Sequence, residues 1–241
     1  PPGPPASASG HASGDATWVG STHSGAPVSG SPRNRPAAVS AATTVTVATA
    51  GQNGMGQSQQ GVTTGELAPM FTLKDTNGKE HSLEAVLAKD STKAVVIEWF
   101  NPDCPFVVKH HRNNTTMKDL AKKYADQGIV WMAIYSGAEG LQGAGLQRNQ
   151  RAVKDYGIAY PVLMDMSGKV GRQYGAKRTP EMFVISKDGQ IVYHGAIDSD
   201  RSARNLGDTN YVDDALRAHL NGESIEMART QAYGCSVKYR N

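Results

Sequence analysis

The sequence contains two cysteines, and one of them stands where a reactive thiol is expected. Cys104 follows the apolar and β-branched run 94–100, which predicts a buried strand, and it precedes a helical pattern. A cysteine at a helix N-terminus lies close to partial positive charge and free backbone N–H groups, and this favours the thiolate. Pro105 suits the first helical turn because its missing N–H is not needed there. We therefore predict a nucleophile rather than a small core residue.

Cys235 is the candidate for resolving an oxidised Cys104. It lies in a segment that also contains Gly, Ser, Thr and Ala, which we expect to swing toward the first cysteine at small entropic cost. The alternative is a tail cysteine that only packs against the domain, because sequence spacing does not show whether two thiols come within disulfide reach. Two cysteines exclude a disulfide-stabilised scaffold and leave a reversible redox couple in either an oxidising or a reducing compartment.

Three charged residues could support thiol chemistry. Glu98 is the one acid in the predicted strand and could accept or shuttle a proton during exchange, whereas a solvated or edge-facing glutamate is the alternative. Lys177 and Arg178 could favour the thiolate through their charge if the fold brings them close. Loop cations of this kind are more often only solvated.

Metal binding is a further option that the spacing does not favour. His110 and His111, together with Cys104 and Cys235, could bind a soft ion such as Cu(I). No compact ligand spacing is present, and a pair of histidines on a helix surface is the plainer interpretation. We therefore expect neither a metal nor another cofactor.

Composition divides the chain into three parts. Residues 1–65 contain only three charged side chains and are rich in Gly, Ser, Ala, Thr and Pro, so they cannot bury enough apolar area to offset their ordering entropy. We predict a disordered segment over 1–64, one domain over 65–225 and a C-terminal tail over 226–241 that carries Cys235. The central part is long enough for one hydrophobic core.

Charge and hydropathy limit the possible partners. The net charge is +3 at pH 7, both signs are interspersed, and no basic block indicates nucleic acid or an anionic membrane. No run approaches the roughly 18 apolar residues of a membrane span. Residues 33–50 have arginines before a mildly apolar run and an Ala-Thr-Ala spacing typical of signal-peptidase sites, but the run is too polar for a good export signal. Both a periplasmic or exported and a cytoplasmic location stay open.

The remaining pattern predicts an α/β fold. Asn77-Gly78 indicates a hairpin between 70–75 and 79–83, and Ser82 could cap a short helix. Further strands are expected over 129–135, 161–164, 182–185 and 191–197, and helices over 117–124, 147–156, 170–174 and 211–220. This alternation predicts a central mixed sheet flanked by helices. The glycine-rich stretch 137–145 is expected to be mobile.

The surroundings of Cys104 resemble the thioredoxin superfamily. Its members share the order strand, short turn, cysteine at a helix start and following proline. Glu98 has the spacing at which thioredoxins carry a buried acid behind the reactive cysteine. Thr179-Pro180, before the strand 182–185, is similar to the cis-proline loop that faces this cysteine. The resemblance implies that Pro180 lies beside Cys104 and that the backbone there pairs with an extended substrate, in a site to which Thr179, Pro105 and Arg178 contribute.

Within that superfamily the chain is most similar to the peroxiredoxin-like branch of redoxin-domain proteins, the AhpC/TSA type. The similarity runs from about Gly65 to Tyr239 and includes the segments 99–107 and 233–239. It implies a thioredoxin-like fold with an N-terminal hairpin extension and an antioxidant or thiol–disulfide oxidoreductase activity.

Two departures from family patterns leave the substrate open. Position 107 is Val, so no Cys-x-x-Cys pair exists, and Pro102 lies too close to Cys104 for the peroxiredoxin Pro-x-x-x-Thr-x-x-Cys pattern. By register, the peroxiredoxin arginine falls near Pro180 and not at Arg178. We predict a thiol-dependent oxidoreductase in which Cys104 attacks a disulfide or a peroxide and Cys235 or an external thiol resolves the product. Its partners would be protein or small-molecule thiols and disulfides. The alternative is a non-catalytic thioredoxin-fold module that senses redox state or metal or binds a protein.

Overall fold

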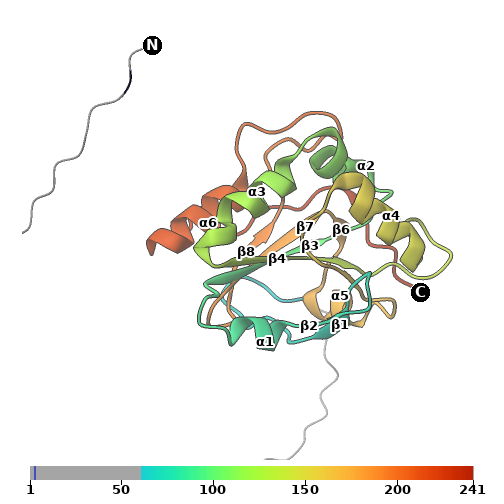
Figure 1. Ribbon diagram of the computed structural model, residues 1–241, viewed down its shortest axis with the longest axis horizontal. Coiled ribbons are helices and arrows are strands. Elements are labelled where there is room, and N and C mark those ends of the chain that lie inside the picture. Colours follow the sequence, from blue (N-terminus) through green and yellow to red (C-terminus); the bar gives the residue numbers. More distant parts are fainter. Residues whose placement is uncertain (1–2, 4–60, 241) are drawn as a thin grey trace, which may run out of the picture. The chain divides into compact units, whose positions relative to one another are not determined.

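The computed structural model of the chain describes Gly3 and residues 61–240 (Figure 1). The signal-like region 33–50 and the segment expected to be disordered lie outside these residues, apart from 61–64. Gly61 lies against Gly175, and Val62 packs against a hydrophobic cluster of the domain. The folded domain therefore includes residues before the expected boundary at 65.

The centre of the domain is a mixed five-stranded sheet in the order β5-β4-β3-β7-β8. Its strands are β3 (Ala94–Trp99), β4 (Ile129–Tyr135), β5 (Val162–Met164), β7 (Glu181–Ser186) and β8 (Ile191–Gly195). β3 and β4 are parallel, as are β4 and β5, whereas β7 is antiparallel to both β3 and β8. All six residues of β3 are buried, which agrees with its nearly continuous apolar sequence.

Helices cover both faces of this sheet (Figure 1). The α-helices are α1 (Leu83–Leu87), α2 (Pro105–Val108), α3 (Thr116–Tyr124), α4 (Leu146–Tyr156), α5 (Lys169–Tyr174) and α6 (Tyr211–Asn221). α2 continues into the π-helix η1 (Lys109–Asn113), and α3 into the 3₁₀-helix η2 (Ala125–Gln127). One core cluster joins α2, α3, α4 and α6 to the β3 face that carries Val96, and a second joins α1 and α5 to the face that carries Val95.

The expected N-terminal hairpin is present as β1 (Thr72–Lys74) and β2 (Glu80–Ser82). Its turn is stabilised by the Asp75 carboxylate, which accepts hydrogen bonds from the backbone N–H groups of Asn77 at 2.8 Å and Lys79 at 3.0 Å. Ser82 caps α1 as expected, since its hydroxyl accepts from the Ala85 N–H.

The C-terminal tail is packed on the domain, whereas its composition predicted a segment that swings toward Cys104. β9 (Cys235–Ser236) pairs in antiparallel fashion with β6 (Arg178–Thr179). Tyr233 is 5% exposed, and the Tyr239 hydroxyl donates to the Ala176 carbonyl at 2.8 Å. Composition suggested mobility because Gly, Ser, Thr and Ala dominate the segment by number, but its aromatic side chains bury enough area to hold it in place. Within residues 61–240, no helix is both long and apolar enough to cross a membrane.

Candidate active site

Cys104 lies at the turn between β3 and α2, as the sequence predicts. The Asn101 side-chain oxygen accepts from the Asp103 N–H at 2.9 Å, and the Cys104 N–H donates to the Asn101 carbonyl at 3.1 Å. This Asx turn ends the strand and starts the helix. Cys104 is the N-cap of α2, with extended backbone angles, and Pro105 occupies the first turn.

The Cys104 side chain is buried in the described structure and has 0% exposure. Its Sγ donates to the Thr179 carbonyl oxygen at 2.9 Å, and the Thr179–Pro180 peptide bond is cis, as the resemblance implied. The same side chain belongs to the core cluster that contains Val107 and Met182. The thiol is therefore placed beside the cis-proline loop, but an oxidant reaches it only after local opening.

Cys235 lies in β9 directly opposite Thr179, the residue whose carbonyl binds Cys104. Both cysteines are free thiols. Burial, followed by the neighbouring Cys104 thiol, raises the pKa of Cys235 to about 12, while the charges of Lys238 and Arg178 act in the opposite direction. At neutral pH Cys235 is thus a protonated thiol next to Cys104, which suits a second, resolving step better than an initial attack.

Glu98 is fully buried, so the alternative of a solvated or edge-facing glutamate is wrong. Its carboxylate accepts from His111 Nε2 at 2.9 and 3.0 Å and from the Tyr160 hydroxyl at 3.3 Å. His111 Nδ1 has no hydrogen-bond partner in the described part of the chain, so Nε2 is the ring nitrogen that holds the carboxylate. Glu98 lies on the same face of β3 as Val96 and Phe100, which pack in the core cluster of Cys104.

His111 and Tyr160 are site residues that sequence reasoning missed or misplaced. Both histidines of η1 are buried, so the interpretation as a histidine pair on a helix surface is wrong. In residues 61–240, no group of three or more His, Cys, Asp or Glu side chains is arranged to hold a metal ion. The only sequence signal for His111 was its spacing of two helical turns from Cys104.

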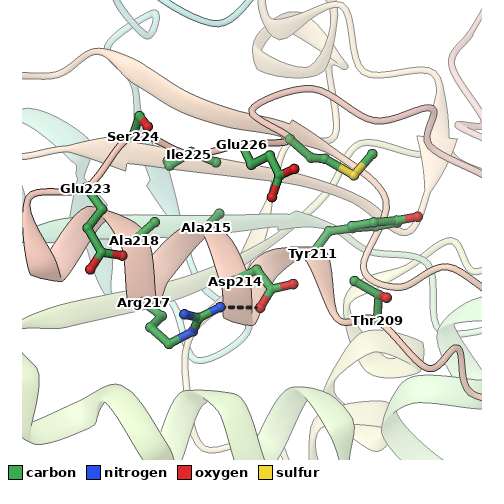
Figure 2. Close-up of a pocket in the computed structure, with 11 residues that line it drawn as sticks. Thr209, Tyr211, Asp214, Ala215, Arg217, Ala218, Glu223, Ser224, Ile225 and Glu226 are labelled. Carbon is green, nitrogen blue, oxygen red and sulfur yellow. Dashed lines mark hydrogen bonds and ion pairs between the residues drawn. The ribbon is translucent and has the colours of Figure 1, made fainter.

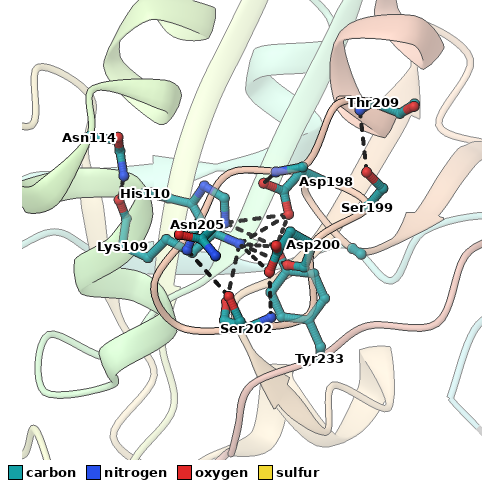
Figure 3. Close-up of polar contacts among 12 residues, drawn as sticks. Lys109, His110, Asn114, Asp198, Ser199, Asp200, Ser202, Asn205, Thr209 and Tyr233 are labelled. Atoms are coloured by element: carbon teal, nitrogen blue, oxygen red, sulfur yellow. Dashed lines mark hydrogen bonds and ion pairs between the residues drawn. The ribbon is translucent and has the colours of Figure 1, made fainter.

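His110 instead belongs to a buried polar cluster with Lys109, Asp198 and Tyr233 (Figure 3). Lys109 Nζ lies 3.3 Å from Asp198 Oδ1, and His110 Nε2 lies 3.0 Å from the Tyr233 hydroxyl. Burial lowers the pKa of His110 to about 4, although the carboxylate of Asp198 acts in the opposite direction. His110 is therefore neutral at physiological pH.

Arg178 and Lys177 contribute backbone groups beside the cis-proline loop, and the Arg178 charge acts on Cys235. Their N–H groups donate to the Glu181 carboxylate at 2.8 and 2.7 Å, and Glu181 also pairs with His194 at 2.7 Å. The exposed Arg178 guanidinium lies 3.4 Å from the Gly234 carbonyl in the tail. Thr179 acts through its carbonyl, since its buried hydroxyl has no partner among the described residues.

The turn before Cys104 is also held from α4. Arg148 donates to Asp103 Oδ1 at 2.8 Å and to the Pro102 carbonyl at 3.1 Å, and the Tyr156 hydroxyl donates to the same carbonyl at 2.6 Å. Gln142 adds a hydrogen bond to the Asp103 carbonyl at 2.9 Å. Gln142 lies in the glycine-rich loop expected to be mobile, and this contact argues against free movement of that loop.

A surface cavity lies away from this site. It has a volume of about 310 Å³ and is lined by α6 and the segment 223–227 (Figure 2). An Asp214–Arg217 ion pair at 2.8 Å, made by two exposed side chains, stands at its wall. The cavity shares no lining residue with the Cys104 site, so we assign it no part in the chemistry.

Comparison with solved structures agrees with this architecture. A hypothetical protein from Sinorhizobium meliloti 1021 superposes with a TM-score of 0.67 at 29% identity, covering 74% of this chain and 96% of that protein. An uncharacterized conserved protein from Geobacillus kaustophilus gives 0.66 at 28% identity, with coverages of 74% and 93%. A protein of the thioredoxin type from Neisseria meningitidis, at 22% identity and a TM-score of 0.50, covers 66% of this chain and 93% of that one and shows the fold alone.

Fold and site together define a thiol-dependent oxidoreductase with a thioredoxin-like fold. The Redoxin family model matches residues 63–212, and the chain belongs to that family. It is also 27% identical to the thiol-disulfide oxidoreductase ResA of Geobacillus thermodenitrificans over 130 residues, which is 54% of this chain and 67% of that protein. The ResA protein of Bacillus subtilis is 25% identical over 134 residues, 56% of this chain and 68% of that protein. The chain spans about two thirds of the length of these relatives.

Proposed function

We propose that the protein performs thiol–disulfide exchange with Cys104 as the nucleophile and Cys235 as the resolving thiol. The observation that carries this proposal is the register of β6 and β9, which sets Cys235 opposite Thr179 while Cys104 Sγ contacts the carbonyl of that same residue. The two thiols are neighbours in the dithiol form. The similarity to ResA, a thiol-disulfide oxidoreductase by name, supports a disulfide substrate.

The first chemical step is attack by the Cys104 thiolate on one sulfur of a substrate disulfide. A bond forms between Cys104 and that sulfur, the substrate S–S bond breaks, and the second substrate sulfur leaves as a thiolate. Cys235 then loses its proton and attacks Cys104 Sγ, which forms the Cys104–Cys235 disulfide and releases the other half of the substrate. The protein has then lost two electrons and two protons to the substrate, and an external dithiol restores it.

A hydroperoxide would enter the same cycle at a different point. Attack by Cys104 on the outer oxygen gives a sulfenic acid and an alcohol, and attack by Cys235 then gives the same disulfide and water. The Glu98–His111 pair is our candidate for accepting the proton of a thiol, because it is the buried carboxylate–imidazole pair on the Cys104 side of the sheet.

Non-reducing peptide mapping by mass spectrometry after one equivalent of oxidant tests the proposal. We expect a peptide pair joined through Cys104 and Cys235 in the wild type. In Cys235→Ser we expect Cys104 to stop at the sulfenic acid after one equivalent of peroxide and to reach the sulfinic acid after a second, or to accumulate as a mixed disulfide after an exchange reagent. Intermolecular Cys104 dimers with a reduced Cys235 would contradict the two-cysteine cycle and leave resolution to an external thiol.

Complete burial of Cys104 favours a second candidate, a non-catalytic module that senses redox state or binds a protein. Alkylation of the native protein as a function of pH separates the two. A catalytic thiol reacts at pH values below the range of an ordinary cysteine, whereas a core thiol reacts at the slow rate of unfolding at every pH. Cys104→Ser, which leaves only Cys235, identifies the signal of each cysteine.

A further inference from the structure

The sheet edge beside Cys104 is filled by the chain's own tail. β6 precedes the cis-proline and would be free to pair with an extended polypeptide if β9 were absent. In the structure β9 pairs with it, and the Val237 N–H extends the ladder by donating to the Lys177 carbonyl at 3.0 Å. The tail and an incoming polypeptide therefore cannot pair with β6 at the same time.

A buried set of polar side chains holds the tail on this edge. We call Lys109, His110, Asp198 and Tyr233 the tail latch (Figure 3). The Tyr233 hydroxyl donates to Asp198 Oδ1 and lies 3.0 Å from His110 Nε2, and Lys109 Nζ lies 5.0 Å above the Tyr233 ring. All four side chains are buried. Tyr233 is the only member from the tail, and it stands two residues before Cys235.

The hydrogen bonds of the tail latch to Tyr233 exist only while the tail is docked. Lys109 is fully buried, and its charge is compensated by Asp198 and by the carbonyls of Asp200 at 2.8 Å and Ser202 at 3.2 Å. Removal of Tyr233 would leave the Asp198 carboxylate and His110 without the phenol that joins them. The Tyr233 ring also packs on Phe106 in α2, with ring centroids 5.9 Å apart, next to Cys104. Docking of the tail thus places Tyr233 against the helix that follows Cys104.

We propose that Tyr233 and the buried Lys109–Asp198 pair are specificity-determining residues that keep β9 on β6, so that Cys104 selects compact small-molecule disulfides over extended polypeptide disulfides. A compact disulfide needs only the local opening that exposes Cys104 Sγ. An extended polypeptide also needs the β6 edge, and it obtains that edge only when the latch releases. The inference rests on the proposed function, because it requires Cys104 to be the nucleophile.

Two disulfide probes that release the same leaving group test this selectivity. Both are mixed disulfides of thionitrobenzoate, one with 2-mercaptoethanol and one with the central cysteine of a short uncharged extended peptide. Attack by the Cys104 thiolate on the mercaptoethanol or peptide sulfur releases the same coloured thiolate, which stopped-flow absorbance records. Every protein in the series carries Cys235→Ser, so that Cys104 is the only cysteine able to react.

Tyr233→Phe is the test variant, and Tyr124→Phe is the matched control. Tyr124 also donates its hydroxyl to a carboxylate, that of Asp213 at 2.7 Å, but it belongs to α3 and lies outside the tail. We expect Tyr233→Phe to raise the peptide rate about tenfold or more and the mercaptoethanol rate less than about twofold, because it removes hydrogen bonds to a charged, buried partner. The ratio of the two rates should not change in Tyr124→Phe.

Three outcomes would overturn the inference. The peptide could react as fast as mercaptoethanol before the latch is altered, both rates could rise together in Tyr233→Phe, or neither could change. Failure of Cys104 to react with either probe in any variant contradicts the proposed function itself.

If Tyr233→Phe does not fold by circular dichroism, Gly234→Ala takes its place with the same expected ratio, because it acts on the strand rather than on the latch. Faster hydrogen exchange at the Val237 amide reports release of β9 in either variant.

Discussion

Glu98 has no contact with solvent, so its partners determine whether a carboxylate is tolerated there. His111 supplies two of its close contacts, and Tyr160 supplies a longer one. We predict that His111→Leu lowers the free energy of unfolding by roughly 3–5 kcal/mol, the range observed when one member of a buried pair is removed. Denaturant unfolding measures the change. His219→Leu, on the partly exposed side of α6, is the control and should stay within about 0.5 kcal/mol of wild type. Equal effects of the two substitutions would show that the pair is not important for stability.

His110 makes the free energy of unfolding depend on pH, and the direction of this dependence follows from its lowered pKa. Burial depresses its pKa in the folded protein from 6.5 to about 4, so the unfolded chain binds a proton over a range in which the folded protein does not. Stability is therefore complete above pH 6.5 and falls as the pH drops toward 4, by up to about 3 kcal/mol from this residue. We expect His110→Gln to have a shallower decline than wild type in urea unfolding at pH values from 7 to 4. A parallel decline in the two proteins would mean that His110 protonates as easily in the fold as outside it.

At the scale of single residues, the sequence predicts contacts between neighbours in the chain but not contacts between residues far apart in it. The role of Cys104 at a helix start could be predicted, because strand, turn residues and Pro105 are consecutive. Glu98 could be singled out by its spacing, but its partners could not. Tyr160 lies 62 residues away from Glu98, and the packing of the segment before β5 beside β3 and β4 brings them together. Burial of Lys109 was equally hidden, since a lysine in a helical pattern ordinarily lies in solvent.

The position of β9 is sensitive to a single backbone change. Gly234 has φ +120°, and a Cβ there would lie 2.2 Å from the Thr179 carbonyl oxygen, the acceptor of the Cys104 thiol. We predict that Gly234→Ala moves β9 away from β6 and speeds hydrogen exchange at the Val237 amide, which donates to the Lys177 carbonyl, by about tenfold or more. Backbone strain at one residue costs on the order of 1–3 kcal/mol, which is enough for a change of this size. Gly222→Ala is the matched control, because Gly222 also has positive φ but a Cβ there meets nothing within 4 Å. Val237 exchange that is equally fast in both variants would show that Gly234 does not hold β9 on β6.

Helices and strands with a turn motif or an apolar run of their own could be predicted from the sequence. Strands that form only by pairing with a distant segment could not. The hairpin of β1 and β2 follows from Asn77-Gly78, and the central strands follow from apolar runs such as that of β4. β6 and β9 have two residues each, so neither carries a periodicity that could be recognised. Their pairing exists because the tail is anchored on both sides, by Tyr233 before the strand and by Tyr239 after it.

At the scale of the whole molecule, the C-terminal tail closes the domain over its own reactive centre. Thr230 donates its backbone N–H to the His194 carbonyl of β8 at 3.1 Å, and the Lys238 carbonyl accepts from Ala138 after β4 at 2.6 Å. The tail thus contacts segments that lie far apart in the sequence. Because of these contacts, the tail belongs to the folded domain, although composition predicted a boundary at residue 226.

The same closure predicts how oxidation changes the stability of the molecule. Cys104 and Cys235 are neighbours before any bond forms, so a disulfide between them needs little rearrangement in the folded state. In the unfolded chain the bond closes a loop of more than 100 residues, which by the chain-entropy estimate stabilises the fold by roughly 4–5 kcal/mol. A protein of this size should then unfold about 10 °C higher when oxidised. Thermal unfolding with and without reductant measures this shift, and Cys235→Ser should show none. An oxidised protein that melts at the same temperature or lower would mean that the bond strains β9. Cys235 would then resolve Cys104 only transiently, and the stable oxidised form would carry an external thiol.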